Sequence, residues 1–292
     1  MEFANIAVTS AKVDNKEGLA INYDLYTPIS GGNKEFPVII FLHGFKGFKD
    51  WGPFPDACEE LARAGFCVLA INFSHNGIGD GKTEYKRLDL FEENTLSSDL
   101  EDVKAVIDAL QAEKITSAHA SLNTDEMGII GHSRGGHTAV AAAVEFEAIH
   151  CIVTWAAVAD YLNRITDREK KDWEEKGYTE YQNSRTNQMM KVNKTFYDDL
   201  SQNADKLIAL RVAKYLTIPS LFIHGREDET VPQTDAEQLH IACTAKENEL
   251  RFIANAGHTF GGAHPFEDDH FPKEFDELLD YTTSWFRQHL RG

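Results

Sequence analysis

The stretch GIIGHSRGGHTA, residues 128–139, begins with a short apolar run and decides the fold of this chain. One serine, Ser133, stands there among three glycines, Gly131, Gly135 and Gly136. The five residues centred on Ser133 match G-x-S-x-G, which marks a sharp turn from a strand into a helix with the serine exposed at the turn. Glycines on both sides leave room where a Cβ would clash. The stretch therefore predicts a nucleophile elbow with Ser133 as the nucleophile.

Apolar runs alternate with helical patterns on both sides of this stretch. Nearly continuous apolar runs are typical of strands covered on both faces, as in parallel sheets. Such runs predict strands at 38–44, 67–73, 126–133, 151–157, 220–225 and 249–257. Two alternating segments, 3–10 and 19–26, predict an antiparallel pair of strands at the start of the chain, and helices are expected at 56–64, 98–110, 135–146, 234–242 and 272–290. Ser98 or Asp99 is expected to cap the second of these helices. The alternation predicts an α/β fold, a mostly parallel, doubly wound, eight-stranded sheet with an antiparallel N-terminal edge.

One polar segment interrupts this alternation. Residues 161–214 lie between two expected strands and look mostly helical. A structureless loop of that length is improbable in a compact domain, so the segment is expected to be an inserted helical cap. We therefore expect a single domain over residues 1–292 that carries one insertion at 161–214.

A serine hydroxyl becomes nucleophilic only when a base takes its proton and an acid orients that base. Asp228 follows a strand that ends at Gly225, and His258 follows the last strand. Both positions lie at strand carboxyl ends, where open α/β sheets gather their ligand groups. The chain order serine, aspartate, histidine is the one that accompanies this elbow. Glu227 and Glu229 are rivals for the acidic role, and Asp228 is preferred.

Acyl transfer also needs hydrogen-bond donors aimed at the oxyanion of the tetrahedral intermediate. The backbone N–H of Arg134, next to the nucleophile, is the first candidate. The second is the backbone N–H of Phe45, in the loop after the apolar run at 38–42. His43 is expected to brace this loop rather than take part in the chemistry.

Composition excludes several other classes of protein. The formal net charge of −18 argues against binding to nucleic acid or to anionic membrane surfaces. No apolar run approaches the roughly 20 residues of a membrane span. The four scattered cysteines lack metal or redox spacing, and the N-terminus does not resemble a signal peptide. A cytoplasmic location is the expectation.

Four motifs in this order resemble the α/β-hydrolase superfamily: LHGFKGFKDW, GHSRGG, HGREDETVP and AGHTFGG. The nearest likeness is to the esterases grouped with dienelactone hydrolases and cinnamoyl or feruloyl esterases, although dienelactone hydrolases themselves use cysteine where Ser133 stands. Serine oligopeptidases share the elbow but carry a large propeller domain, for which this chain has no room. The resemblance implies the α/β-hydrolase fold and hydrolysis, most often of carboxylic esters, through an acyl-serine intermediate without metal or cofactor.

Two weaker patterns concern ligands. His258, His264 and His270 recur every six residues, with Asp268 and Asp269 beside them, but this spacing does not suit chelation, and no metal site is expected. The insertion 161–214 holds eleven Lys and Arg against nine Asp and Glu. Either this is a solvated surface of mixed charge, or Arg164 or Arg185 attracts an anionic substrate. In the second case Lys46 and Lys49 are expected to help.

The predicted function is a serine carboxylesterase acting on small or medium esters, including aromatic or anionic ones. An acyltransferase or a small-peptide or amide hydrolase with the same triad remains the alternative. A non-catalytic binding module is disfavoured because no member of the triad is missing. The expected partner is a small-molecule ester, and a homodimer is left open.

Overall fold

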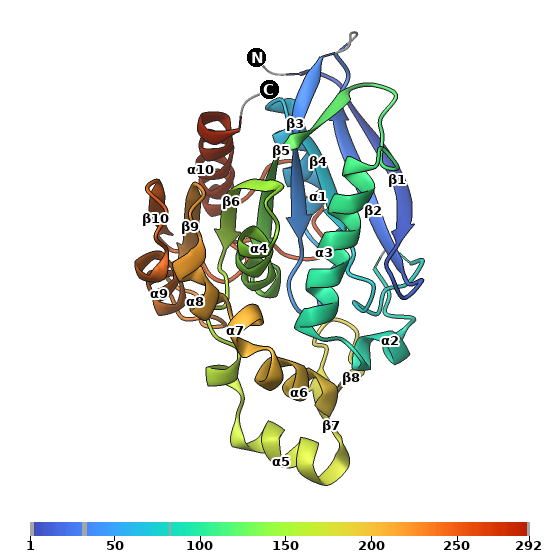
Figure 1. Ribbon diagram of the computed structural model, residues 1–292, viewed down its shortest axis with the longest axis vertical. Coiled ribbons are helices and arrows are strands. Elements are labelled where there is room, and N and C mark those ends of the chain that lie inside the picture. Colours follow the sequence, from blue (N-terminus) through green and yellow to red (C-terminus); the bar gives the residue numbers. More distant parts are fainter. Residues whose placement is uncertain (1–2, 31–33, 82, 291–292) are drawn as a thin grey trace.

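The computed structural model describes residues 3–30, 34–81 and 83–290, and it contains the predicted sheet of eight strands (Figure 1). The strand order is β1-β2-β4-β3-β5-β6-β9-β10. The strands are β1 Ile6–Asp14, β2 Ala20–Pro28, β3 Glu35–Leu42, β4 Cys67–Ile71, β5 Ser121–His132, β6 Ile149–Trp155, β9 Ser220–Gly225 and β10 Asn248–Ile253. The pairs β1–β2 and β2–β4 are antiparallel and all others are parallel, which confirms the predicted edge.

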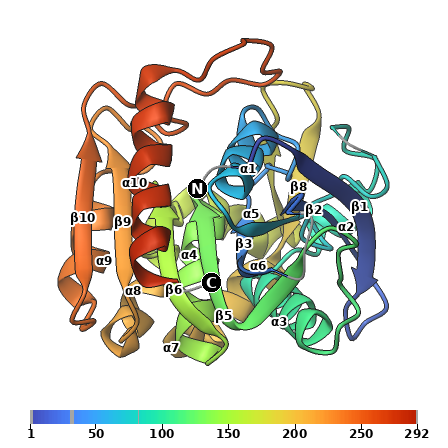
Figure 2. The same cartoon turned by 90° about the horizontal axis from the view of Figure 1, so that it is seen from above.

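Helices cover both faces of the sheet, as the almost fully buried central strands require (Figure 2). On one face α1 (Phe54–Arg63) and α10 (Lys273–His289) share one apolar core with the sheet. On the other face α3 (Leu96–Gln111), α4 (Arg134–Glu145) and α9 (Thr234–Ala242) share a second. The two cores hold the central parallel strands, and with them their carboxyl ends, in fixed positions.

The segment 161–214, which was expected to be a helical cap, contains a pair of strands as well as helices. It contains the helical elements η1 Leu162–Arg164, α5 Asp167–Lys176, α6 Lys194–Gln202, α7 Ala204–Leu207, α8 Ala209–Val212 and η2 Ala213–Tyr215. It also contains an antiparallel hairpin, β7 (Tyr178–Gln182) paired with β8 (Met189–Asn193). Figure 1 shows α5, α6 and the hairpin beyond the carboxyl ends of the parallel strands.

Two further local details depart from the sequence expectation. The helix expected from residue 98 begins at Leu96, and its N-cap is Thr95, in a capping box with Ser98. Asp99 does not cap this helix, because its carboxylate pairs with Arg134 instead. A short helix, α2 (Leu88–Glu92), precedes it and was not expected.

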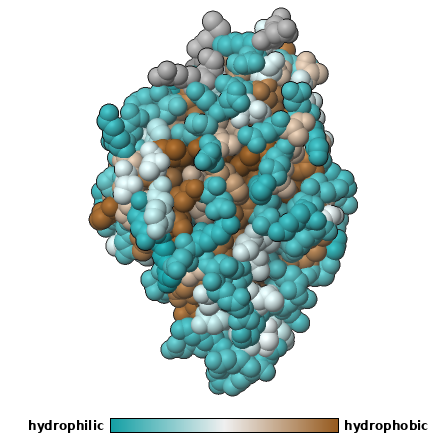
Figure 3. Space-filling view, in the orientation of Figure 1, coloured by the Kyte–Doolittle hydropathy of each residue, from teal (hydrophilic) through white to brown (hydrophobic). Residues whose placement is uncertain are grey.

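The surface agrees with the charged composition. The insertion is mostly hydrophilic on the face drawn in Figure 3, where an interfacial lid would present a large apolar patch. Within the described residues, no helix has both the length and the apolar character needed to cross a membrane.

Candidate active site

The turn at Ser133 has the strained geometry expected of a nucleophile elbow. Ser133 lies between β5 and α4 with φ 55° and ψ −113°, a conformation that non-glycine residues rarely adopt. Its backbone N–H donates to the carbonyl of Trp155 at 2.8 Å, which ties the turn to β6. A Cβ at Gly131 would lie 2.1 Å from the carbonyl oxygen of Gly135, and one at Gly135 would lie 2.3 Å from that of Leu42. The close packing of this turn therefore requires glycine at positions 131 and 135.

The structure brings Asp228 and His258 together from two separate loops. Asp228 follows β9, and His258 follows β10, the neighbouring strand. The Nδ1 atom of His258 lies 2.8 Å from Oδ2 of Asp228. The other carboxylate oxygen, Oδ1, accepts the backbone N–H groups of Thr230 and Val231, each at 2.8 Å. The rival acids Glu227 and Glu229 have no contact of this kind with His258 among the described residues.

Asp228 is held in its charged form although its side chain is fully buried. Burial alone would raise the pKa of this carboxyl, but the hydrogen bonds from His224 and His258 outweigh burial and hold the pKa well below its usual range. The Nδ1 nitrogen of His258 therefore carries the proton that Asp228 accepts. This leaves Nε2 as the nitrogen of His258 that is available to a reacting group.

His224 contacts the same carboxylate and was missed from the sequence. Its Nε2 lies 2.9 Å from the carbonyl of Val231 and 3.2 Å from Oδ2 of Asp228. Both neighbours are acceptors, so Nε2 carries the proton. The sequence HGRED could have indicated this contact, because it places His224 on the expected strand four residues before Asp228.

His132, which precedes the elbow serine, packs against His258. The Nε2 atom of His132 lies 2.9 Å from the backbone carbonyl of His258, and the ring centroids are 4.8 Å apart. Burial, and then the nearby His258, lower the pKa of His132 to about 3. A neutral His132 can therefore donate to this carbonyl and fix the loop that carries His258.

Ser133 and His258 face one pocket of about 670 Å³, a volume within the usual range for small-molecule sites. Phe45, Arg134, Arg164 and Arg185 line the same pocket. The pocket is walled by the loop after β3, by the insertion 161–214 and by the loops after β9 and β10. All the site residues predicted from sequence, apart from the buried Asp228 behind His258, thus contribute to this pocket.

The two predicted oxyanion donors come from the elbow itself and from the loop after β3. Arg134 is the first residue of α4, so its N–H has no acceptor within the helix. Neither this N–H nor that of Phe45 has a hydrogen-bond partner in the described part of the chain. His43 braces the loop before Phe45: its Nδ1 lies 2.9 Å from the carbonyl of Gly44, and its Nε2 lies 3.3 Å from the N–H of Phe73. Burial lowers the pKa of His43 to about 4, so the ring is neutral.

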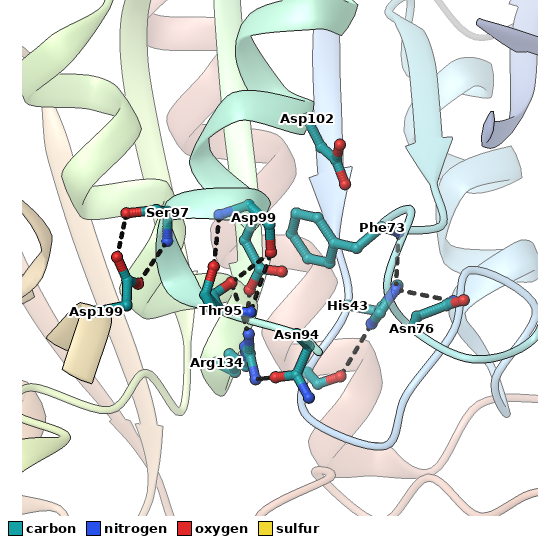
Figure 4. A network of polar contacts seen from close by, with 12 residues as sticks. His43, Phe73, Asn76, Asn94, Thr95, Ser97, Asp99, Asp102, Arg134 and Asp199 are labelled. Carbon is teal, nitrogen blue, oxygen red and sulfur yellow. Dashed lines mark hydrogen bonds and ion pairs between the residues drawn. The ribbon is translucent and has the colours of Figure 1, made fainter. Parts of the chain in front are cut away.

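The side chain of Arg134 has a role that the sequence did not indicate. Figure 4 shows it directed at the start of α3, where its Nε lies 2.7 Å from Oδ2 of Asp99. The guanidinium also donates to the side chain of Asn94 at 2.5 Å and to the carbonyl of Thr95 at 3.1 Å. Both members of the ion pair are buried. The guanidinium thereby fixes the elbow to α3.

The insertion is attached at the same place. The guanidinium of Arg134 lies 5.8 Å from the ring centroid of Phe45 and 5.4 Å from that of Phe196 on α6. In the first turn of α3, Ser97 donates its backbone N–H and its hydroxyl to Asp199 of α6, at 3.0 and 2.5 Å (Figure 4). The elbow, the loop after β3 and the insertion therefore meet around one buried cation.

The basic residues that were predicted to contact the substrate differ in whether they reach the pocket. Arg164 and Arg185 are exposed and line the pocket, and Lys46 lines it too. Lys49 does not, because its ammonium is buried in ion pairs with Asp24 and Asp50. The expectation that Lys49 assists substrate binding is therefore wrong.

The histidines of the considered metal pattern are separated in the structure. The Nδ1 atom of His264 accepts the backbone N–H of Gly52 at 2.8 Å, and His270 lines a different surface groove. The described residues contain no cluster of histidine, cysteine and acidic side chains arranged to hold a metal ion.

Fold and pocket together define a serine hydrolase of the α/β-hydrolase superfamily. The chain belongs, more narrowly, to the prolyl oligopeptidase family, because the model of that family matches residues 57–289. This corrects the sequence argument that set serine oligopeptidases aside. The match lies in the region that holds the elbow and the loops of Asp228 and His258, so it does not depend on a propeller.

Several known proteins are similar to this chain at low sequence identity. An uncharacterized 31.7 kDa protein from the traX-finO intergenic region of Escherichia coli is 23% identical, and the alignment covers 94% of this chain and 97% of that protein. The uncharacterized peptidase YuxL of Bacillus subtilis (strain 168) is 24% identical over 94% of this chain but only 38% of its own length. Est1E of Butyrivibrio proteoclasticus, solved with ferulic acid bound, superposes with a TM-score of 0.68 at 20% identity and covers 96% of this chain and 99% of its own.

Proposed function

We propose that this serine hydrolase cleaves carboxylic esters through an acyl-serine intermediate. The observation that carries the proposal is the 2.8 Å contact between His258 and Asp228 in a pocket that Ser133 also lines. A pocket of about 670 Å³ suits a small or medium ester. The similarity to Est1E, which binds ferulic acid, supports an ester with an aromatic acid, although likeness at this identity concerns the fold.

In the proposed reaction the oxygen of Ser133 attacks the ester carbonyl while Nε2 of His258 takes the serine proton. Asp228 keeps the imidazole in the required tautomer and stabilises the imidazolium. The N–H groups of Phe45 and Arg134 receive the oxyanion, each contributing about 3 kcal/mol to the transition state. His258 then gives the proton to the leaving alcohol, and a water activated by the same nitrogen frees the acid and restores Ser133.

Peptide hydrolysis is the second candidate, because the family is that of prolyl oligopeptidases and one relative is described as a peptidase. The same groups serve an amide, whose leaving amine must be protonated by His258. An acyltransferase would use the same acyl-serine with an alcohol or amine in place of water.

A labelling experiment tests the proposal. A fluorophosphonate should add one label, on Ser133, and abolish hydrolysis of a 4-nitrophenyl ester. Ser133→Ala should lose both label and turnover, whereas Ser201→Ala, at an exposed serine of α6, should keep both. Hydrolysis that persists in Ser133→Ala would refute the assignment.

Matched substrates separate the two candidates. A 4-nitrophenyl ester and the 4-nitroanilide of the same acyl group differ only in the bond that is cleaved. The ester proposal requires kcat/KM for the ester to exceed that for the anilide by more than their difference in intrinsic reactivity. A comparable or larger kcat/KM for peptide anilides would favour the peptidase. An added alcohol that diverts the acyl group from water would indicate transfer.

A further inference from the structure

Three basic side chains line the pocket without a carboxylate partner. Lys46, Arg164 and Arg185 form no ion pair with any acidic residue that the structure describes, in a chain whose net charge is −18. Among the pocket-lining residues Glu169 is the acid, and its oxygens accept from Thr166 and from the hydroxyl of Tyr181. The pocket thus has an excess of positive charge that no ion pair among the described residues neutralises.

Of these three cations, Arg164 is the least available to a bound anion. Its Nη2 donates to the carbonyl of Thr230 at 2.6 Å, in the loop that holds Asp228. Its charge also acts on the buried carboxyl of Asp235, where it counters the rise in pKa that burial causes. A nearby carboxylate therefore already balances part of the charge of Arg164.

Lys46 and Arg185 lie on a second wall and are joined through Tyr85. The hydroxyl of Tyr85 donates to the backbone carbonyl of Lys46, and the guanidinium of Arg185 lies 5.8 Å from the ring centroid of Tyr85. The ring of Phe48, with its centroid 5.4 Å from the guanidinium, also supports Arg185. One N–H of Arg185 donates to the carbonyl of Thr83 at 2.6 Å.

These contacts hold the two cations in place and leave most of their donors unused. A guanidinium has five N–H donors and an ammonium has three. The structure gives Arg185 one backbone acceptor, and Lys46 has one at 3.4 Å, the carbonyl of Gln182. Burial lowers the pKa of Lys46, as expected for a cation that lacks a counter-charge. An anionic group bound here would accept the remaining donors and supply the missing charge.

We infer that Lys46 and Arg185 form an anion-binding wall, and that the preferred substrate carries a carboxylate group in addition to the bond that is cleaved. The inference rests on the proposed ester hydrolysis and names the substrate class for it. Lys46 directly follows Phe45, so a group bound to this wall lies beside the loop that receives the oxyanion.

The test compares a neutral ester with its charged counterpart. In the first pair, 4-nitrophenyl butyrate is neutral and 4-nitrophenyl hemisuccinate has a carboxylate on the acyl group. In the second pair, phenyl acetate is neutral and 4-acetoxybenzoate has a carboxylate on the leaving alcohol. The quantity measured is the ratio of kcat/KM, charged over neutral, in wild type, Lys46→Met, Arg185→Gln and Arg164→Gln. The ratio cancels damage that affects all substrates alike. Lys214→Met, which removes one charge from the insertion outside the pocket, controls for long-range charge.

The inference requires a ratio of about ten or more for at least one pair at low salt, which corresponds to about 1.4 kcal/mol. This ratio should fall at least about threefold in Lys46→Met and in Arg185→Gln, fall less in Arg164→Gln, and stay unchanged in Lys214→Met. Added salt should reduce it, because these side chains are partly exposed. A neutral preference in both pairs, or ratios that Lys46→Met and Arg185→Gln leave unchanged, would overturn the inference. Failure of the proposed function is distinct, since then no ester would be cleaved in a Ser133-dependent way.

Discussion

The buried ion pair between Arg134 and Asp99 gives the sharpest quantitative prediction. In Asp99→Asn the guanidinium keeps its charge, because arginine does not deprotonate in proteins, but loses its carboxylate. The exposed fractions of the two side chains are only 6% and 4%, so water cannot replace the lost partner. Removing one member of a buried pair typically costs about 3–5 kcal/mol. Asn94 and the carbonyl of Thr95 still hold the guanidinium, so we expect a loss near the lower end, about 3 kcal/mol.

A surface pair on the same helix is the matched control. Lys104 and Asp108 of α3 are 2.6 Å apart, with side chains 50% and 59% exposed. Such exposed pairs contribute about 0.2–1 kcal/mol, so Asp108→Asn should change stability by less than about 1 kcal/mol. Both variants remove one carboxylate from α3, and they differ in burial.

Urea unfolding followed by circular dichroism and by tryptophan fluorescence measures both changes, provided that the two signals coincide. The double variant Arg134→Met with Asp99→Leu should cost clearly less than the sum of its single variants, with a coupling energy of about 1–3 kcal/mol. If Asp99→Asn is no more destabilising than Asp108→Asn, or if the single effects are additive, the pair does not hold the elbow to α3. Because Arg134 also supplies a proposed oxyanion donor, kcat should fall in Asp99→Asn even where the protein remains folded.

Four further outcomes are expected. Asp228→Asn should lower kcat by about 10⁴-fold while Glu227→Gln changes it little, and the reverse would move the acid by one residue. Prolonged chelation should leave kcat/KM unchanged, and a loss that one divalent ion restores would contradict this. Gly135→Ala should abolish soluble, active protein, because its Cβ would lie 2.3 Å from a backbone oxygen. Burial raises the pKa of Asp102 to about 7, so the unfolded chain, with a pKa of about 3.9, loses this proton first as the pH rises. The free energy of unfolding should therefore fall between about pH 4 and pH 7, and Asp102→Asn should flatten that part of the urea-derived profile.

Features that depend on local pattern were predictable from the sequence. Six strands followed from apolar runs and the first two from alternating segments. The elbow followed from the local pattern G-x-S-x-G, and the structure adds that the close contact at Gly135 comes from Leu42 on β3. The pairing of Asp228 with His258 followed because both come directly after strands whose carboxyl ends meet at one edge of the sheet. Their roles in catalysis remain a prediction that the labelling and substitution experiments test.

Features that depend on tertiary partners were not predictable. Lys49 resembles an available pocket lysine in the sequence, but its partner Asp24 lies on β2, 25 residues earlier in the chain. The strands of the hairpin β7–β8 are polar, and among the described residues they pair only with each other. Their alternation of apolar and polar residues is therefore too weak to distinguish them, in the sequence, from the charged helices on either side. For Arg134 the sequence indicated only a backbone N–H next to the nucleophile. No local pattern shows that its side chain pairs with a buried acid on another helix.

The pocket combines two parts that are built separately. The strands and their loops place Ser133, His258 and Asp228, and this arrangement depends on backbone contacts in the sheet. The insertion 161–214 supplies another wall and is joined to the body near the pocket by individual side-chain contacts, such as Asp199 with Ser97 and Arg185 with Thr83. Substitutions of exposed side chains in the insertion can therefore alter the charge and shape of the pocket without moving the elbow. It follows that variants of Arg185 should act mainly on the choice among substrates, whereas variants of the elbow glycines should act on every substrate alike.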